Sequence, residues 1–82
     1  MQMNLKILSP DKIIVDKPAD FVSLMMESGS VGILHGHVPL AGKLVRSYVK
    51  FDHEGKEEKV PVDGGYAWIM PDSVTVFTAG RQ

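Results

Sequence analysis

The chain has 82 residues, of which 44% are hydrophobic, and a formal net charge of −1 at pH 7. It contains no cysteine, which excludes disulfide bonds and thiolate metal sites, and it has no basic block of the kind that nucleic-acid-binding domains carry. Because no apolar run is long enough to span a membrane and the N-terminus shows no signal peptide, we expect one soluble, intracellular domain over residues 1–82.

Apolar and polar residues alternate in the first part of the chain, which is typical of β-strands. Residues 3–7 predict a first strand with its apolar side chains on one face, and a turn at residues 9–11 joins it to a short strand at residues 13–15. Pro18 is expected to break the chain there. Residues 20–26 then predict a strand with apolar side chains on both faces, so both of its faces should be covered.

The same alternation continues in the second part of the chain. Val45, Val49 and Phe51 are expected on the inner face of one strand. Residues 52–56 predict a hairpin turn, because their glycine can adopt the left-handed conformation that such turns need. The return strand contains Pro61, which favours a sheet edge because proline has no N–H to donate.

Two further turns are predicted before the chain ends. The adjacent glycines in residues 63–65 predict one turn, and Pro71-Asp72 predicts another before the final strand. No segment shows the 3.6-residue apolar period of a helix. We therefore expect a single all-β domain, an antiparallel β-sandwich of about nine or ten short strands, because alternating strands need a second layer over their apolar face.

One segment does not fit an ordinary strand or loop. GSVGILHGHVPLAG, residues 29–42, combines four glycines, two histidines and a proline with an apolar run. Glycines weaken strand interiors, and a solvent-exposed loop would not need Val31, Ile33 and Leu34. The composition indicates either a metal-binding or catalytic loop, or a shaped surface that another protein recognises.

The histidines of this segment suggest the metal hypothesis. His35 and His37 are two residues apart, so in an extended segment both imidazoles could bind one metal ion. A zinc site needs further ligands, and the nearest carboxylates, Glu27 and Asp52, lie beyond the glycines. The chain also lacks a nucleophile-elbow motif and a phosphate-binding glycine motif. We therefore expect no catalytic residues, no metal and no cofactor, and a ligand- or metal-binding module that uses His35 and His37 is the alternative.

Three segments in order resemble one protein family, the epsilon subunit of F-type ATP synthases, which is called delta in mitochondria. They are LKILSPDKIIVDK, GSVGILHGHVPLAGKL and VDGGYAWIMPDSVTVFTA. The first is similar to the family's opening strands with their Pro-Asp turn, and the second to its Gly-x-x-Gly-Ile-Leu and Gly-His-x-Pro-Leu motifs. The third is similar to its closing strands. The resemblance covers nearly the whole chain.

The resemblance implies a role without catalysis. The family's N-terminal β-sandwich lies at the foot of the rotating central stalk, where it packs on the gamma subunit and on loops of the membrane-embedded c-ring. It thereby couples ion translocation to ATP synthesis. The resemblance also implies a peripheral location at the cytoplasmic face of a bacterial plasma membrane, or at the equivalent organellar membrane, with membrane contact only through the c-ring.

The resemblance assigns three roles to residues of this chain. The expected contacts with the c-ring are Gly29, Ser30, Val31 and His37. The expected contacts with gamma are Ser9, His37 and Gly42. The residues expected to shape the loop are Gly32, Gly36, Pro39 and Leu40.

The sequence departs from the family pattern in three ways. Ser30 replaces a glutamate that pairs with positive charge on the c-ring, and His35 replaces a proline before Gly36. The family's two-helix C-terminal domain, which can inhibit ATP hydrolysis and in some members binds ATP, has no counterpart in these 82 residues. If this is the natural length, we expect coupling without that inhibition and without an ATP site.

Overall fold

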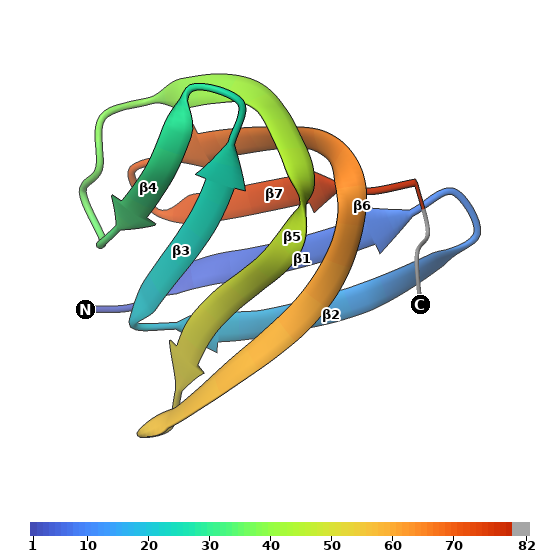
Figure 1. The fold of residues 1–82 in the computed structure, drawn as a ribbon. Coiled ribbons are helices and arrows are strands. Elements are labelled where there is room, and N and C mark those ends of the chain that lie inside the picture. Colours follow the sequence, from blue (N-terminus) through green and yellow to red (C-terminus); the bar gives the residue numbers. More distant parts are fainter. Residues whose placement is uncertain (80–82) are drawn as a thin grey trace.

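The structure, a computed structural model, describes residues 1–79, and within that range the chain forms strands and no helix. The strands are β1 (Met3–Ser9), β2 (Lys12–Ala19), β3 (Phe21–Met26), β4 (Gly29–Ile33), β5 (Leu40–His53), β6 (Lys56–Met70) and β7 (Ser73–Phe77). They form one hydrogen-bonded sheet in the order β2-β1-β7-β6-β5-β3-β4 (Figure 1).

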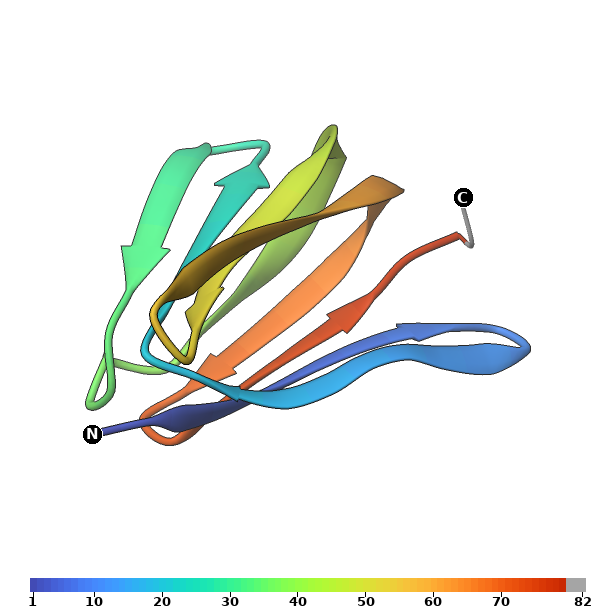
Figure 2. The same ribbon diagram turned by 90° about the horizontal axis from the view of Figure 1, so that it is seen from below.

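This sheet folds over on itself into two layers, which confirms the predicted β-sandwich. Figure 2 shows β1, β2 and β7 in one layer and β3 and β4 in the other, while the long strands β5 and β6 run through both. Most pairings are antiparallel, as predicted, but β1 and β7 pair in parallel, with Leu5 opposite Val74. Parallel neighbours need a long crossover connection, and here the rest of the domain supplies it.

Seven strands form in place of the predicted nine or ten, and one reason is that the expected turn at residues 63–65 does not exist. Those residues lie inside β6, which pairs with β5 from His53↔Lys56 to Leu40↔Ile69 without a change of register. Gly64 and Gly65 have φ values of +77° and +118°. These conformations, which L-residues with a β-carbon rarely adopt, bend the strand from one layer into the other.

The bend also changes which residues of each strand face the core. In β6 both Val62 and Ala67 are buried although they are an odd number of residues apart. In β5 the core residues are Leu44, Val49 and Phe51, whereas Val45, which was predicted to face inward, is 36% exposed. Strict alternation fails here because the two strands bend together at the glycine pair.

A second prediction, that Pro18 breaks the chain, is also wrong. Pro18 lies within β2, opposite Asn4 of β1, and the bend comes two residues later at Asp20. Because β2 is the outermost strand of the sheet, its outer side has no neighbouring strand to which an N–H must be donated. An edge strand therefore accommodates the proline.

The hairpin between β5 and β6 is confirmed. Glu54 and Gly55 form a two-residue loop with φ values of +53° and +79°, the pattern of a type I′ turn. Pro61 lies in the half of β6 that pairs only with β5, since β6 meets β7 at residues 66–70. Pro61 thus occupies a local sheet edge, as predicted.

A single hydrophobic core fills the space between the layers. Its buried side chains come from every strand, and the apolar positions predicted in residues 3–7 are among the most buried. The core residues are Met3, Leu5, Ile7, Val15, Ala19, Val22, Leu24, Met26, Ile33, Leu44, Val49, Phe51, Val62, Ala67, Ile69, Val74 and Val76. Residues 21–26 are buried on one face only, because Met25 on the other face is 43% exposed.

Candidate functional site

The glycine-rich segment forms three parts of the structure: strand β4, a loop at residues 34–39 and the start of β5. Its apolar residues have different environments. Ile33 is fully buried and Val31 packs against the core, so these two residues anchor the segment. Leu34 is 62% exposed and Val38 is 71% exposed, which gives the loop an apolar surface.

Backbone hydrogen bonds hold the loop in place. The Gly36 N–H donates to the carbonyl oxygen of Pro71 at 2.7 Å, and the His37 N–H donates to the carbonyl oxygen of Leu34 at 3.1 Å. Gly36 has φ +90°, so a side chain at this position would strain the backbone although the space around it is open. The loop is therefore a shaped surface fixed against the turn between β6 and β7.

The residues predicted to meet the c-ring lie together along one edge of the domain. Gly29, Ser30 and Val31 are successive residues of β4, the last strand of the sheet, and Gly29 and Ser30 are exposed. His37 follows in the adjoining loop, where its Nδ1 lies 2.7 Å from the carbonyl oxygen of Val38. Figure 1 shows β4 and this loop at the same side of the molecule.

The residues predicted to shape the loop have different surroundings. A β-carbon at Gly32 would lie 3.2 Å from Cζ of Phe21, so the Phe21 ring covers this glycine. Pro39 and Leu40 are exposed at the start of β5. Gly42, predicted to lie near gamma, faces inward, since a β-carbon there would lie 2.7 Å from Cε of Met26.

Ser9 is separated from the other predicted contacts. It ends β1, and its hydroxyl donates to Oδ1 of Asp11 at 2.9 Å across the turn to β2. Figures 1 and 2 both show the β1–β2 hairpin at the opposite end of the domain from the loop at residues 34–39. The structure therefore does not bring Ser9 and His37 together.

An apolar face spans the distance between these two ends. The rings of Tyr66, Trp68 and Phe77 are each between 44% and 49% exposed, and Trp68 meets Phe77 edge to face with ring centroids 5.6 Å apart. Phe77 lies opposite Leu8, next to Ser9. We call Tyr66, Trp68, Met70 and Phe77 the aromatic face.

The other end of the aromatic face adjoins the glycine-rich segment. A shallow hollow of about 240 Å³ is lined by Pro39, Leu40, Ala41, Trp68, Ile69 and Met70. Exposed apolar surface that extends over several neighbouring strands is typical of protein–protein interaction sites. The aromatic face thus links the Ser9 end to the loop end by a surface suited to a protein partner.

Comparison with known proteins identifies the family. A family model described as "ATP synthase, Delta/Epsilon chain, beta-sandwich domain" matches residues 2–80. The chain belongs to this family. It is 36% identical over 78 residues to the ATP synthase epsilon chains of Bacillus mycoides (strain KBAB4) and Bacillus cereus (strain B4264). These alignments cover 95% of this chain but 59% of each relative, so the chain spans about three-fifths of their length.

Solved structures of ATP synthases contain the same fold. A chain in the cryo-EM structure of the Euglena gracilis mitochondrial ATP synthase, OSCP/F1/c-ring, has a TM-score of 0.89 and 23% identity, covering 96% of this chain and 51% of that one. A chain in the Tetrahymena thermophila central stalk/c-ring structure has a TM-score of 0.77 and 10% identity, covering 98% and 65%. At these identities the likeness shows the fold alone.

The geometry of this delta/epsilon domain does not support the metal alternative. Within residues 1–79 there is no group of three or more His, Cys, Asp or Glu residues that could hold a metal ion, so His35 and His37 lack a third ligand there. The third histidine, His53, has its Nδ1 2.8 Å from the carbonyl oxygen of Pro18. The described residues also include no helix long and apolar enough to cross a membrane.

Two features of the surface escaped the sequence analysis although signals for them existed. Phe77 follows Val74 and Val76, whose burial by alternation implies that Phe77 points outward. The hairpin loop at Glu54-Gly55 sets the register that places Lys50 opposite Lys59. Both features are therefore predictable from the alternation of the strand and from the turn chemistry.

Proposed function

We propose that the chain is a non-catalytic central-stalk subunit of an F-type ATP synthase, which links the c-ring to the gamma subunit and couples ion translocation to ATP synthesis. The observation that carries this proposal is the family match over residues 2–80, together with 36% identity to epsilon chains over 95% of the chain. The subunit then lies at the membrane periphery, on the cytoplasmic face in a bacterium, and contacts the membrane only through the c-ring.

The c-ring contact in this proposal lies along β4 and the loop that follows it. Gly29 and Ser30 leave the backbone of an edge strand accessible, because neither has a bulky side chain. Val31 fixes this edge to the core, and His37 extends the contact into the loop. The loop is exposed, and hydrogen bonds hold it on the sandwich. Its orientation relative to the rest of the domain is therefore fixed, which transmission of torque requires.

The gamma contact in this proposal is the aromatic face together with its two ends. Ser9 lies beside Phe77 at one end, and His37 and Gly42 belong to the segment at the other. Aromatic residues are enriched at protein interfaces because they bury a large area at a low entropic cost. The three residues predicted to contact gamma therefore do not form one compact site. They lie at the two ends of one continuous apolar surface.

Isothermal titration calorimetry with the purified cognate gamma subunit tests this function. We expect the chain to bind gamma, and we expect a Ser30→Ala/His37→Ala double variant to retain gamma binding within about fivefold, since exposed polar contacts each contribute little. The same variant should lose more affinity for the isolated c-ring. Absence of binding between the folded chain and a folded, cognate gamma subunit would contradict the stalk assignment.

A further inference from the structure

The hollow of about 240 Å³ at the loop end of the aromatic face has one small side chain in its wall. Ala41 of β5 lies directly opposite Trp68 of β6, and the neighbouring pair is Leu40 with Ile69. Because the Ile69 side chain is buried in the core, alternation places Ala41 and Trp68 on the outer face, and Ile69 contributes only its backbone to the floor of the hollow. The hollow therefore exists because position 41 has a methyl group where a larger side chain would fill it. We call it the Ala41 hollow.

Contacts on two sides hold the Ala41 hollow open. The Trp68 ring meets Phe77 edge to face, with ring centroids 5.6 Å apart, which fixes the aromatic wall. At the other side, the hydrogen bond of 2.7 Å from the Gly36 N–H to the carbonyl oxygen of Pro71 ties the loop before β5 to the turn after β6. A site that is already formed loses little conformational entropy when a partner binds.

The walls of the Ala41 hollow are uncharged. Among residues 1–79, those that line it carry no carboxylate, ammonium, guanidinium or hydroxyl group, and Lys43, two residues along the same face of β5, does not line it. A charged side chain placed there would lose its water without gaining an ion pair, which is unfavourable. Pockets for small molecules have volumes of roughly 300–1,000 Å³, so this smaller hollow matches a single apolar side chain such as leucine, methionine or phenylalanine.

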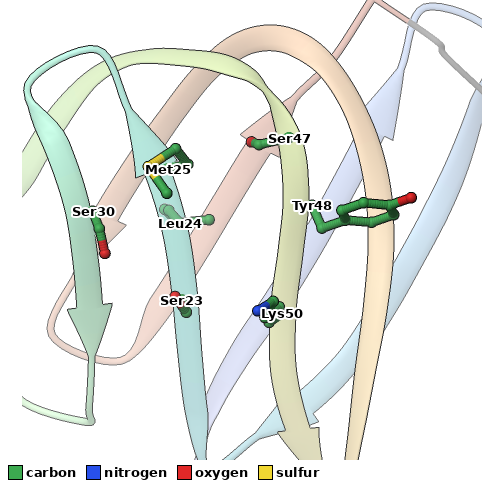
Figure 3. Close-up of a pocket in the computed structure, with 7 residues that line it drawn as sticks. All are labelled: Ser23, Leu24, Met25, Ser30, Ser47, Tyr48 and Lys50. Carbon is green, nitrogen blue, oxygen red and sulfur yellow. The ribbon is translucent and has the colours of Figure 1, made fainter.

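Another hollow, of about 340 Å³, has a different chemistry. It lies on the outer surface of the other layer, where Figure 3 shows the side chains of Ser23, Ser30, Ser47 and Lys50 around it. Hydroxyl groups and an ammonium group together favour no single class of ligand. The Ala41 hollow, in contrast, selects its occupant by one property, the apolar character of its wall.

The occupant of the Ala41 hollow comes from a different protein. A concave surface cannot fill itself across a two-fold axis, so a second copy would have to insert a side chain from elsewhere on its surface, and such head-to-tail contacts generate filaments unless the rotation closes a ring. The hollow is continuous with the aromatic face, because Trp68 and Met70 belong to both. Interfaces concentrate their binding energy where an anchor side chain fills a pocket surrounded by further contacts. The protein that covers the aromatic face therefore also fills the hollow.

We propose that the Ala41 hollow binds one large apolar side chain of the protein that packs on the aromatic face, and that Ala41 is a specificity-determining residue of this contact. The inference rests on the proposed function in one respect, since that function makes this partner the gamma subunit. The inserted side chain packs against Trp68, and Ala41 admits it by being small. A larger residue at position 41 excludes it without changing the fold, because Ala41 is exposed.

The first arm of the test is calorimetry with the purified cognate gamma subunit. We expect Ala41→Val to weaken binding about threefold and Ala41→Leu at least roughly tenfold, because each added group occupies space that the inserted side chain needs. Tyr48→Leu, which introduces the same side chain at an exposed position of β5 opposite Pro61, is the control and should bind within about twofold of the parent chain. Both Ala41 variants should unfold within about 3 °C of the parent chain. Equal affinities for Ala41→Leu and the parent chain would overturn the proposal.

An alanine scan of the leucine, methionine and phenylalanine residues of gamma identifies the inserted side chain. Its alanine variant should lose affinity for the parent chain but little further affinity for Ala41→Leu, because the two changes remove the same contact. If the effects of every such pair of changes are additive, no side chain of gamma enters the hollow and the proposal is wrong.

The second arm does not depend on gamma. N-acetyl-leucinamide and N-acetyl-glutaminamide, which are similar in size and differ in polarity, are titrated while the fluorescence of Trp68, the only tryptophan of the chain, is recorded. We expect a saturable shift with a Kd of about 1–10 mM for N-acetyl-leucinamide, as for a ligand of this size. We expect no shift with the glutamine compound, and none with either compound in Ala41→Leu.

Three results of this second arm would overturn the proposal. They are an equal response to both compounds, no response to N-acetyl-leucinamide, and a concentration-dependent dimerisation of the parent chain in sedimentation experiments that Ala41→Leu abolishes. The last of these would assign the hollow to a second copy of the chain.

The two arms separate the failure of this inference from the failure of the proposed function. If the parent chain fails to bind gamma but N-acetyl-leucinamide binds to it and not to Ala41→Leu, the stalk assignment and the gamma source of the side chain are wrong while the apolar site stands. If the chain binds gamma but neither the Ala41 variants nor N-acetyl-leucinamide has an effect, the stalk assignment stands and the apolar site is wrong.

Discussion

Replacing Gly65 by alanine tests whether the bend in β6 determines the fold. Gly65 has φ +118°, and its added β-carbon would overlap the carbonyl oxygen of Phe77 and lie 2.8 Å from the Phe77 carbonyl carbon. The unfavourable φ alone costs about 1–2 kcal/mol. Because the obstacle is the backbone of β7, the Tyr66↔Phe77 pairing must also open. We expect a total loss of about 3–5 kcal/mol in the free energy of unfolding, a value that such a backbone clash can reach.

Gly64→Ala is the matched control. Gly64 also has positive φ, +77°, but its added β-carbon would lie 3.3 Å from the carbonyl oxygen of Leu44, a tight contact without overlap. We therefore expect a loss of only about 1–2 kcal/mol for this variant. A domain of this size has a total stability of about 4–12 kcal/mol, so Gly65→Ala should remove a large part of it and Gly64→Ala a small part.

Urea and thermal unfolding, followed by fluorescence of Trp68 and by circular dichroism, measure this difference. Trp68 is the only tryptophan of the chain and contacts Phe77, which lies next to the proposed clash. With about 4–8 °C per kcal/mol, we expect Tm to fall by roughly 4–16 °C in Gly64→Ala and by roughly 12–40 °C in Gly65→Ala. Equal stability of the two variants would refute the argument that the approach of β6 to β7 requires glycine at position 65.

Three further predictions concern the surface. Trp68→Ala should weaken binding to gamma by about 2 kcal/mol, roughly 30-fold, if the aromatic face is the docking surface, because a central aromatic is a typical hot spot; calorimetry measures this. Lys17→Ala should cost no more than about 1 kcal/mol of stability, and nothing at high salt, since the 3.2 Å pair of Lys17 with Glu58 is partly exposed; urea unfolding at two salt concentrations measures it. Added zinc should leave Tm unchanged, because His35 and His37 have no third ligand among the described residues; thermal scans with and without zinc measure this.

Controls and contrary outcomes distinguish these predictions. Tyr48→Ala removes an aromatic side chain that is 50% exposed on β5, opposite Pro61 in the part of β6 that does not meet β7, and should leave gamma binding intact. If Trp68→Ala behaves like Tyr48→Ala, the aromatic face does not bind gamma. A Lys17→Ala loss that persists at high salt would mean that its aliphatic stem, and not its charge, stabilises the fold. A rise in Tm with zinc that His37→Ala abolishes would restore the metal hypothesis.

Much of the fold could be predicted from local patterns. The alternation of residues 3–7 and 73–76 is that of strands with one apolar face, and these apolar side chains lie in the core. The two-residue hairpin followed from the left-handed preference at Gly55. The order of the motifs identified the family. These features depend on interactions between residues that are close in sequence, or on the order of motifs along the chain, which the family model matches over residues 2–80.

The bend in β6 could not be predicted in the same way. Gly64-Gly65 permits both a tight turn and a bend within a strand, because glycine adopts positive φ in either. The close approach of β7, which comes from a distant part of the chain, decides between them. Three other features depend on where each strand lies in the sheet, which a local sequence pattern does not specify. They are the number of strands, the exposure of Val45 and the presence of Pro18 within the edge strand β2.

The candidate surfaces show the same division. The sequence by itself determined the chemistry available to them: glycines and a serine along residues 29–32, aromatic residues in the last strands and lysines on either side of the hairpin. The tertiary structure alone decided that Ser9 and His37 lie at opposite ends, that Trp68 packs on Phe77, and that Lys50 borders a hollow containing Ser30. The physical reason is that a surface is formed by strands paired across the sheet, and that pairing is set by burial of the common core.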